Sequence, residues 1–174
     1  YGGGRWLVVG ESGVVLTSTD GATWASRPAL GSGFLRALAY GQGQFLIGGA
    51  GGALYSTTDA TTFTPVPIAM TPIIEGPAIA SGCFWVSGSD GLLASATQLG
   101  TWAISAFSPQ TTYRGLAVRG PDEASAVGER AAATFVRGRW GSVFYVPGFL
   151  GTAAIGGENE VIAVGFGCSI DRKS

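Results

Sequence analysis

The sequence predicts an all-β protein made of small repeated sheets, and three observations carry this prediction. The 174 residues include 30 glycines spread evenly along the chain, which indicates many tight turns. The apolar runs between them are short and rich in β-branched and aromatic residues, and none places apolar residues at helical spacing over three turns. The third observation is an internal repeat of 39 residues.

The repeat is found by sliding the sequence against itself. Y-G-G-G-R-W-L-V-V-G at residues 1–10 matches Y-G-Q-G-Q-F-L-I-G-G at residues 40–49 and I-A-S-G-C-F-W-V-S-G at residues 79–88. A fourth copy, at residues 124–140, keeps the order of strand, glycine, strand and aromatic residue but shortens the second turn. A fifth, at residues 160–171, starts in step and then stops. The repeat therefore decays toward the C-terminus.

Each complete unit holds four strand-length runs separated by turn residues. In the second unit these are L-R-A-L-A-Y, Q-F-L-I-G-G, A-L-Y-S-T-T and F-T-P-V-P-I. Four strands in about 40 residues are typical of one blade of a β-propeller, in which neighbouring blades stack around an axis. We therefore predict a single β-propeller domain over residues 1–174, with about five four-stranded blade units. The predicted units are 1–34, 35–73, 74–112, 113–149 and 150–174.

The first and last of these units are expected to be incomplete. The innermost strand of a unit is predicted to begin at Leu35, Ile74, Tyr113 and Leu150, whereas Tyr1 opens at the turn that follows such a strand. Two explanations stay open: a five-bladed ring closed by strands from both ends of the chain, or a segment of a larger ring. Because an open sheet edge invites aggregation, some closure is expected, and completion of the ring by oligomerisation is a further alternative.

A polar turn occurs twice, as T-S-T-D-G-A-T-W at residues 17–24 and S-T-T-D-A-T-T-F at residues 56–63. It falls between the third and fourth runs, where the chain must reverse. Side chains of Asp and Ser can accept hydrogen bonds from nearby backbone N–H groups, Gly21 can adopt a positive φ, and Trp24 can pack between blades. The sequence therefore predicts a structural clasp.

This turn resembles the Asp-box, S-x-D-x-G-x-T-W, of bacterial neuraminidase-like (BNR) repeats, in a form one residue shorter. The segment F-L-I-G-G-A-G-G-A-L-Y-S-T-T-D-A-T-T-F is similar to repeats of secreted and surface bacterial propellers, and photosystem II assembly factors are built similarly. The copies depart from the box at Ala60, Phe63 and Gln98, and the fourth copy has none. Such degeneracy favours a structural role for the turn over a binding role.

Charged residues occupy equivalent positions near the start of three inner strands, at Arg36, Glu75 and Arg114, with Gly151 at the fourth. One interpretation is a charged ring at the mouth of the channel that binds an anionic ligand. The other is a ladder that neutralises itself between adjacent blades. Charges near the axis need partners, and the alternating signs supply them, so the sequence favours the ladder.

The loops between second and third strands vary most between units, and they contain Glu11, Asp90, Glu129 and Arg130. Variable loops on a regular scaffold often carry binding, although unselected loops also drift. These four residues form a second candidate site.

Five tryptophans could suggest sugar stacking, but each lies on a strand or at the box aromatic position. We therefore expect core packing for nearly all of Trp6, Trp24, Trp85, Trp102 and Trp140. The two cysteines, Cys83 and Cys168, are predicted two blades apart near opposite faces, which makes them free thiols.

The composition excludes several kinds of function. The chain contains no His, which removes the commonest general base and a common metal ligand, and no metal or other cofactor is expected. A net charge of −1 without a basic run argues against nucleic acid, and the glycine-broken apolar runs argue against membrane insertion. No charged and apolar leader opens the chain, so a signal peptide is expected to be absent or already removed.

We therefore expect a non-catalytic propeller that acts as a scaffold or protein-interaction module. The resemblance to secreted repeats, with the low Lys content, favours a bacterial protein that is extracellular, periplasmic or displayed on the surface. One alternative is a glycan-binding or sialidase-like domain. Sialidases with similar repeats need an arginine triad, whereas only Arg36 and Arg114 align here, and nothing in the spacing of Glu11, Asp90 and Glu129 pairs them as catalytic carboxylates. A second alternative is an assembly factor that binds a protein partner at the channel mouth.

Overall fold

A computed structural model describes residues 1–106, 111–155, 161–166 and 169–171 of the chain. These residues form four antiparallel sheets. The first sheet contains β1 (Trp6–Val9), β2 (Val15–Ser18) and β3 (Ala25–Arg27), and the second contains β4 (Leu35–Gly41), β5 (Gln44–Gly49), β6 (Leu54–Thr57) and β7 (Thr64–Pro65). The third contains β8 (Ile74–Ala80), β9 (Cys83–Gly88), β10 (Leu92–Ala96) and β11 (Ala103–Ala106), and the fourth contains β12 (Tyr113–Gly120), β13 (Glu123–Val136), β14 (Arg139–Ile155), β15 (Val161–Phe166) and β16 (Ser169–Asp171). Two short 3-10 turns, at Glu11–Gly13 and Ala50–Gly52, link β1 to β2 and β5 to β6.

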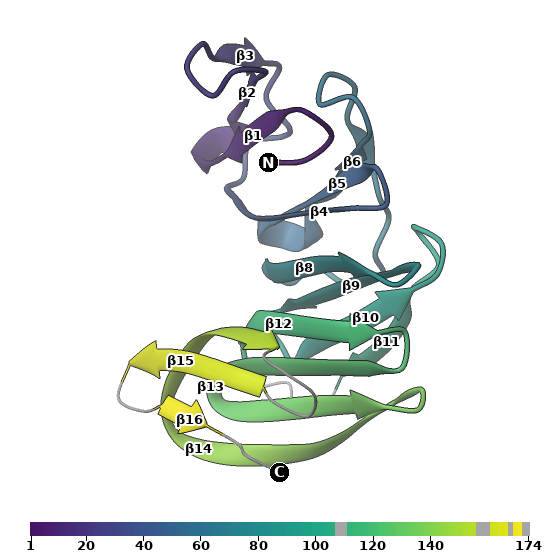
Figure 1. The fold of residues 1–174 in the computed structure, drawn as a ribbon, viewed down its shortest axis with the longest axis vertical. Coiled ribbons are helices and arrows are strands. Elements are labelled where there is room, and N and C mark those ends of the chain that lie inside the picture. Colours follow the sequence, from purple (N-terminus) through teal and green to yellow (C-terminus); the bar gives the residue numbers. More distant parts are fainter. Residues whose placement is uncertain (107–110, 156–160, 167–168, 172–174) are drawn as a thin grey trace.

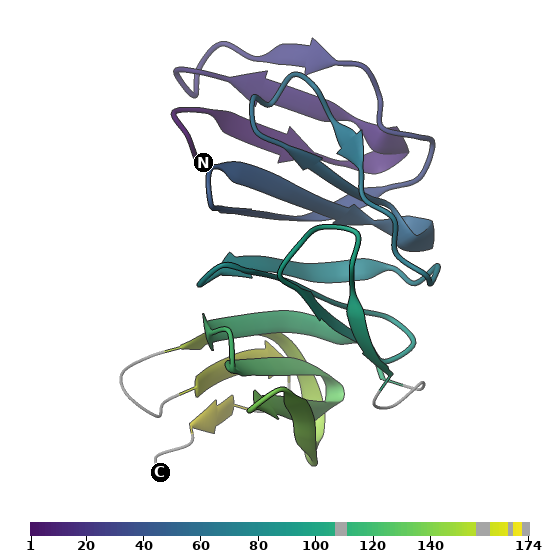
Figure 2. The same cartoon turned by 90° about the vertical axis from the view of Figure 1, so that its right-hand side faces the viewer.

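The sheets follow one another along the long axis of the molecule, from the purple N-terminal sheet to the yellow C-terminal strands (Figures 1 and 2). Their first strands lie side by side: a Cβ on Gly41 of β4 would touch Ile79 of β8, and one on Gly76 of β8 would approach Leu116 of β12. The first and fourth sheets lie at opposite ends, and no described strand from one end pairs with the other. The described residues therefore form an open series of sheets.

The inner strands begin where the repeat predicts them. β4, β8 and β12 start at Leu35, Ile74 and Tyr113. The first sheet has three strands, and its edge strand β1 corresponds in the repeat to β5, the second strand of the second sheet. The first sheet therefore lacks an inner strand, as expected. One glycine of the repeat recurs at the end of the second strand because no side chain fits there. A Cβ on Gly49 would collide with the carbonyl oxygen of Phe34.

The fourth and fifth predicted units depart from the repeat, because they share one five-stranded sheet. Leu150 lies inside β14, which crosses the predicted boundary at residues 149/150. The number of blades thus stays a prediction.

A missing glycine explains why the chain does not turn at residues 129–130. In the earlier units the turn places two successive residues at positive φ, and the second is glycine, as in Ser12 with Gly13 and Asp90 with Gly91. Arg130 has a φ of 58°, but Ala131 follows it, and a second left-handed residue with a side chain is unfavourable. The chain instead continues as β13 with a register shift between Glu129 and Ala131.

Hydrophobic residues from alternate positions of each sheet fill the junctions between sheets. At the junction of the first and second sheets, Leu7 and Val15 pack with Phe45 and Ile47. At the next junction, Leu46 and Leu54 of the second sheet pack with Phe84 and Val86 of the third. The second sheet therefore uses one face for the sheet before it and the other face for the sheet after it.

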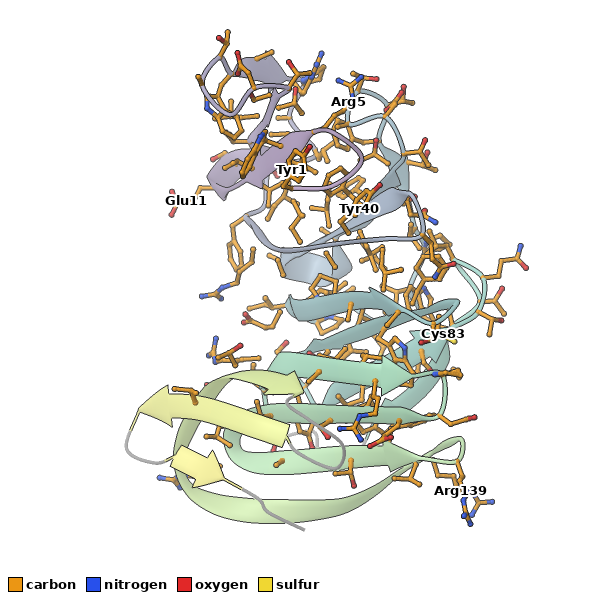
Figure 3. All side chains as sticks on the ribbon, viewed as in Figure 1. Tyr1, Arg5, Glu11, Tyr40, Cys83 and Arg139 are labelled. Atoms are coloured by element: carbon orange, nitrogen blue, oxygen red, sulfur yellow. The ribbon has the colours of Figure 1, made fainter. Side chains whose placement is uncertain are left out.

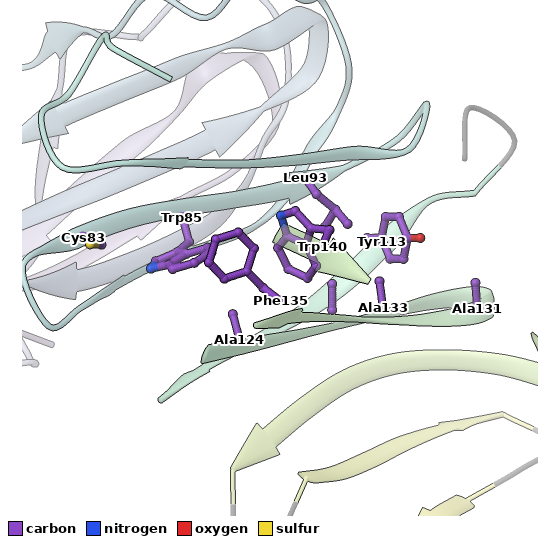
Figure 4. Packing of buried hydrophobic residues seen from close by; sticks show 10 residues of the cluster. Cys83, Trp85, Leu93, Tyr113, Ala124, Ala131, Ala133, Phe135 and Trp140 are labelled. Carbon is purple, nitrogen blue, oxygen red and sulfur yellow. The ribbon is translucent and has the colours of Figure 1, made fainter. Parts of the chain in front are cut away.

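The junction of the third and fourth sheets holds an aromatic cluster (Figure 4). Trp85 meets Phe135 edge to face, with ring centroids 4.8 Å apart, and Phe135 meets Trp140 at 5.3 Å. Ala124 and Ala126 of β13 leave room for the large Trp85 ring. The Trp85 ring of the third sheet thus packs against both large and small side chains of the fourth sheet.

The tryptophans divide into buried and exposed. Trp85 and Trp140 are buried as predicted, and Trp102 is half-buried, with its Nε1 donating to the carbonyl of Pro67 at 3.0 Å. The prediction is wrong for Trp6 and Trp24, which are 42% and 39% exposed. Both lie in the first sheet, where no described sheet covers the outward face.

The remaining sequence predictions concern the thiols and the membrane. Cys83 is buried and free, and Cys168 lies outside the described residues. In the part of the chain that the structure describes, no helix has the length and apolar character that crossing a bilayer requires.

Candidate binding surface

The three aligned charges on the inner strands meet in a chain of ion pairs. Arg36, Glu75 and Arg114 are each the second residue of their strand, so adjacent strands bring their side chains together. Glu75 Oε1 lies 3.2 Å from Nη1 of Arg36 and 3.2 Å from Nη1 of Arg114. Arg114 Nη2 lies 2.8 Å from Glu129 Oε1. We call these four residues the charge ladder.

The charge ladder carries two positive and two negative charges, so it is neutral as a whole. Its middle is sheltered: the Glu75 side chain is 7% exposed and receives both guanidinium groups. Its ends face solvent, because the side chains of Arg36 and Glu129 are 48% and 41% exposed. The Arg36 guanidinium also lies 5.5 Å from the ring centre of the exposed Phe34. A partner could therefore reach a cation beside an aromatic ring at one end and a carboxylate at the other.

The residues predicted on the loop face do not form one cluster. Glu11 is exposed in the turn after β1, and Figure 3 shows it pointing away from the body of the molecule. Asp90 is exposed in the turn after β9, where it accepts a hydrogen bond from Ser89 Oγ at 3.1 Å. The second sheet separates these two turns.

The loop placement of Glu129 and Arg130 is corrected by the structure. Both residues lie in β13, because the turn that would have formed the loop lacks its glycine. Glu129 instead joins the charge ladder, and Arg130 is exposed. The signal for this was present in the sequence as Ala131, at the position that is glycine in the first three units.

The two polar turns form nearly the same hydrogen-bond pattern. Asp20 Oδ1 accepts from the backbone N–H groups of Ala22 and Thr23 at 2.8 and 2.7 Å and from Ser18 Oγ at 2.9 Å. Gly21, at a φ of 77°, donates its N–H to Ser18 Oγ at 2.8 Å. The predicted clasp is therefore present, although Trp24 at its end is exposed rather than packed between sheets.

In the second clasp, Asp59 accepts from Thr61 N–H at 2.8 Å, Thr62 N–H at 2.7 Å and Thr57 Oγ1 at 3.0 Å. The backbone N–H of Thr23 and then that of Ala22 hold the pKa of Asp20 well below its usual range, and Thr62 and Thr61 do the same for the pKa of Asp59. Both carboxylates are therefore charged at neutral pH and occupied by their own turns.

A hollow of about 370 Å³ lies beside the first clasp, and sequence reasoning did not find it. Its lining includes Arg5, Arg27, Asp20 and Trp24. Arg27 donates from Nε to Thr17 Oγ1 at 2.9 Å. The sequence signal that could have indicated the hollow was Arg27. The repeat places the buried, apolar Val66 at the equivalent position of the second unit, so a charged residue at position 27 departs from the pattern. The hollow has the volume of a small-molecule site.

Among the described residues, no three His, Cys, Asp or Glu side chains gather in a way that could hold a metal ion. The charge ladder and the hollow are therefore the candidate sites among the described residues.

Comparison with known proteins defines the fold class. No protein-family model and no curated protein sequence matches the chain. Among solved structures, YCF48 bound to D1 peptide matches with a TM-score of 0.69 at 16% identity, over 94% of this chain. The WD40 repeats of RRP9 match with a TM-score of 0.75 at 9% identity over 92% of this chain, and an ancestral GH74 enzyme matches with a TM-score of 0.63 at 12% identity over 90%.

These similarities show that the chain has a β-propeller fold. It spans 57% of the YCF48 chain, 56% of the RRP9 chain and 25% of the GH74 enzyme. The chain therefore corresponds to little more than half of the first two proteins. The neighbours include one propeller that is bound to a peptide and one enzyme, so the fold is compatible with a protein-interaction scaffold.

Proposed function

We propose that this protein is a non-catalytic interaction module that binds a protein partner at the charge ladder, and that the ladder lies at the mouth of the propeller channel. The observation that carries the proposal is the match of 94% of the chain to a propeller bound to a peptide. The charge ladder supplies a reason for the location, because it joins three inner strands and leaves both ends accessible.

The chemistry of the ladder defines the partner. Glu75 and Arg114 neutralise each other within the protein, so they contribute little to binding. Arg36 is half-exposed, approaches Glu75 at one Nη atom and lies over the exposed Phe34 ring. An acidic side chain next to an apolar one would pair with Arg36 and cover Phe34. We therefore expect an acidic and partly apolar peptide segment.

The test is selection from a displayed random peptide library, followed by calorimetry with the selected peptides. Arg36→Gln removes the exposed cation, and we expect it to weaken binding at least about tenfold. Arg139→Gln is the matched control, because Arg139 is exposed at the start of β14 (Figure 3) and belongs neither to the charge ladder nor to the hollow. Failure to select any peptide, or equal binding by both variants, would contradict the proposal.

The finer architecture belongs to the same proposal. Five blade units of 39 residues, with clasps of the Asp-box type, are supported by the starts of β4, β8 and β12 and by the two matching clasps. Limited proteolysis tests the unit boundaries, because cleavage should concentrate between units. Protection of the segments around residues 34 and 73 equal to that of the strands would argue against them.

We also propose export or surface display, on the basis of the low Lys content and the resemblance to secreted repeats. Fractionation of cells that express the natural gene tests this directly. Recovery in the cytosol alone would contradict it.

A glycan-binding function is the second candidate, and the hollow beside the first clasp favours it. Trp24 offers a partly exposed ring for stacking, and Arg5 and Arg27 offer donors for sugar hydroxyls or carboxylates. A glycan array probed with the protein and with Trp24→Ala distinguishes the candidates. Binding that is lost in Trp24→Ala but kept in Arg36→Gln would favour the glycan site.

A further inference from the structure

The hollow beside the first clasp contains two positive charges that the protein itself does not neutralise. Arg5 and Arg27 both line the hollow, and both are partly buried. In the part of the chain that the structure describes, neither guanidinium group forms an ion pair with a carboxylate. Shielding a cation from water is unfavourable unless an anion pairs with it. The hollow therefore favours the binding of an anion.

The repeat shows that the fold does not require either arginine. One unit later, Arg5 and Arg27 correspond to Gln44 and the buried Val66, and the third unit also has no charged residue at these positions. The second clasp nevertheless forms the same hydrogen bonds between its carboxylate and its backbone as the first clasp does. The two arginines are therefore an addition to the repeated unit, and the clasp does not account for them.

Both arginines are positioned by their own unit. Arg27 donates from Nε to Oγ1 of the buried Thr17 at 2.9 Å, which orients its guanidinium group. Among the described residues, none accepts a hydrogen bond from its Nη atoms. The backbone of Arg5 exchanges two hydrogen bonds with that of Gly2, both of 2.9 Å. This order is present before a ligand binds, so binding costs less entropy.

The charge of the hollow matches a single negative charge. Its charged lining residues are Arg5, Arg27 and Asp20, so two guanidinium groups and one carboxylate leave a net charge of +1. The backbone N–H groups of Thr23 and Ala22 hold the pKa of Asp20 low, so this carboxylate stays charged. A carboxylate or a sulfate ester carries one negative charge and balances the hollow. A phosphate monoester, with a charge of about −1.5 to −2, would exceed this balance and be repelled by Asp20.

The uncharged part of the lining suits a sugar ring. Trp24, which is 39% exposed, supplies an aromatic ring, and Thr19 and Thr23 supply hydroxyl groups. An aromatic ring packs against the C–H face of a sugar, while hydroxyl and guanidinium groups form hydrogen bonds with its hydroxyls. The hollow, of about 370 Å³, lies near the lower end of the range for small-molecule sites, roughly 300–1,000 Å³. This volume suits one ring with its substituents.

We propose that the hollow binds an acidic sugar, whose carboxylate or sulfate ester pairs with Arg5 and Arg27 and whose ring packs against Trp24. This inference rests on the glycan-binding candidate function and specifies the class of glycan. A neutral sugar would leave both guanidinium groups unpaired, so the site selects by charge as well as by shape. The hollow lies on the first sheet, whereas the charge ladder joins the other three, so the two sites can be tested separately (Figure 1).

An NMR titration with sugars that differ in one group tests the proposal. Methyl β-glucuronide carries a carboxylate where methyl β-glucoside carries a hydroxymethyl group, and a third sugar is the glucoside sulfated at that hydroxymethyl oxygen. The backbone amides of Ala22 and Thr23 and the Nε–H of Arg27 report on the hollow. The amides of Thr61 and Thr62 are the internal control, because the second clasp lacks both arginines.

We expect at least one of the two acidic sugars to shift the signals of the first clasp and leave those of the second unchanged. It should bind at least about tenfold more tightly than methyl β-glucoside, because charge-assisted hydrogen bonds form only with the anion. Comparison of the two acidic sugars shows whether a carboxylate or a sulfate ester is the preferred group.

Substitution of the arginines tests which residues select the anion. Arg27→Val and Arg5→Gln introduce the residue types that the second unit has at these positions, so the clasp should still form, and its amide signals check this. Each substitution should weaken binding of the acidic sugar at least about tenfold. Arg139→Gln is the matched control, because it removes an exposed cation outside the hollow and should leave binding unchanged.

Four results would overturn the proposal. Equal binding of the acidic and neutral sugars would leave a glycan site that does not select by charge. Unchanged binding in both Arg27→Val and Arg5→Gln would place the anion elsewhere. Tighter binding of adenosine monophosphate than of either acidic sugar would assign the hollow to nucleotides. The fourth result is that no sugar shifts the first clasp and no glycan on the array binds, in which case the glycan-binding function itself fails.

Discussion

The first and second sheets carry the same residue pattern but differ in what covers them. Phe45 in β5 is 1% exposed, and Trp6 at the equivalent position of β1 is 42% exposed. Their local structures are alike: each lies on a second strand that is followed by a turn, a third strand and a clasp. The difference shows that a repeat determines which face of a blade is apolar, while burial of that face depends on a neighbouring sheet.

Truncation of the covered aromatic residue should have the largest effect. Phe45→Ala removes a ring from the junction of the first two sheets and should lower the free energy of unfolding by about 3–5 kcal/mol. Trp6→Ala, measured by urea unfolding, should cost less than about 1 kcal/mol because Trp6 is 42% exposed and no described sheet packs on it. Equal losses would show that the two faces are equally covered in solution.

The charge ladder sharpens the comparison, because it joins the second, third and fourth sheets and has no member in the first. Glu75→Gln removes the sheltered carboxylate and leaves two guanidinium groups facing each other. We expect a loss of about 2 kcal/mol, between the values for exposed and buried pairs. Amide exchange should accelerate in β8 and β12 more than in β1.

Glu123→Gln is the control for the ladder, because Glu123 is 51% exposed and pairs with Arg119 at 3.2 Å. Its loss should be less than about 0.5 kcal/mol. Similar losses of unfolding free energy for the two substitutions would mean that the burial of Glu75 does not strengthen its ion pairs.

The two clasps differ at one backbone position, which gives the third test. Gly21 has a φ of 77° and Ala60 has a φ of 53°, so both turns need a left-handed residue. A Cβ on Gly21 would also lie 3.2 Å from Nε1 of Trp6. Gly21→Ala should therefore cost about 1–2 kcal/mol, whereas Gly120→Ala, where a Cβ meets nothing within 4 Å, should be nearly neutral.

The clasp carboxylates should produce the smallest effect, which depends on pH. The pKa values of Asp20 and Asp59 are lowered in the folded state, so each contributes stability above the unfolded value of about 3.9 and loses it as the pH falls through the folded pKa. Asp20→Asn keeps the shape but not the charge. The difference in urea midpoint between wild type and this variant should shrink from about pH 6 to about pH 3. A difference in urea midpoint that does not change with pH would show that the charge of Asp20 does not stabilise the folded state.

The sequence by itself determined the repeating unit. The spacing of glycines and apolar runs predicted the starts of β4, β8 and β12, and the Ser and Asp residues of the polar turn predicted the clasp hydrogen bonds. It also predicted that Arg36, Glu75 and Arg114 would neutralise one another, because equivalent positions on adjacent strands lie side by side. These features depend on local geometry and on the period, which a sequence records directly.

Only the tertiary structure decided which faces are covered and where the pattern ends. Trp6 and Trp24 obey the repeat yet are exposed, because burial requires a second sheet that their own residues do not specify. Glu129 moved from a predicted loop into the charge ladder because the chain failed to turn at Ala131. Burial and the pairing of Glu129 with Arg114 depend on the contact between parts of the fold, which is a property of the assembled molecule rather than of any one unit.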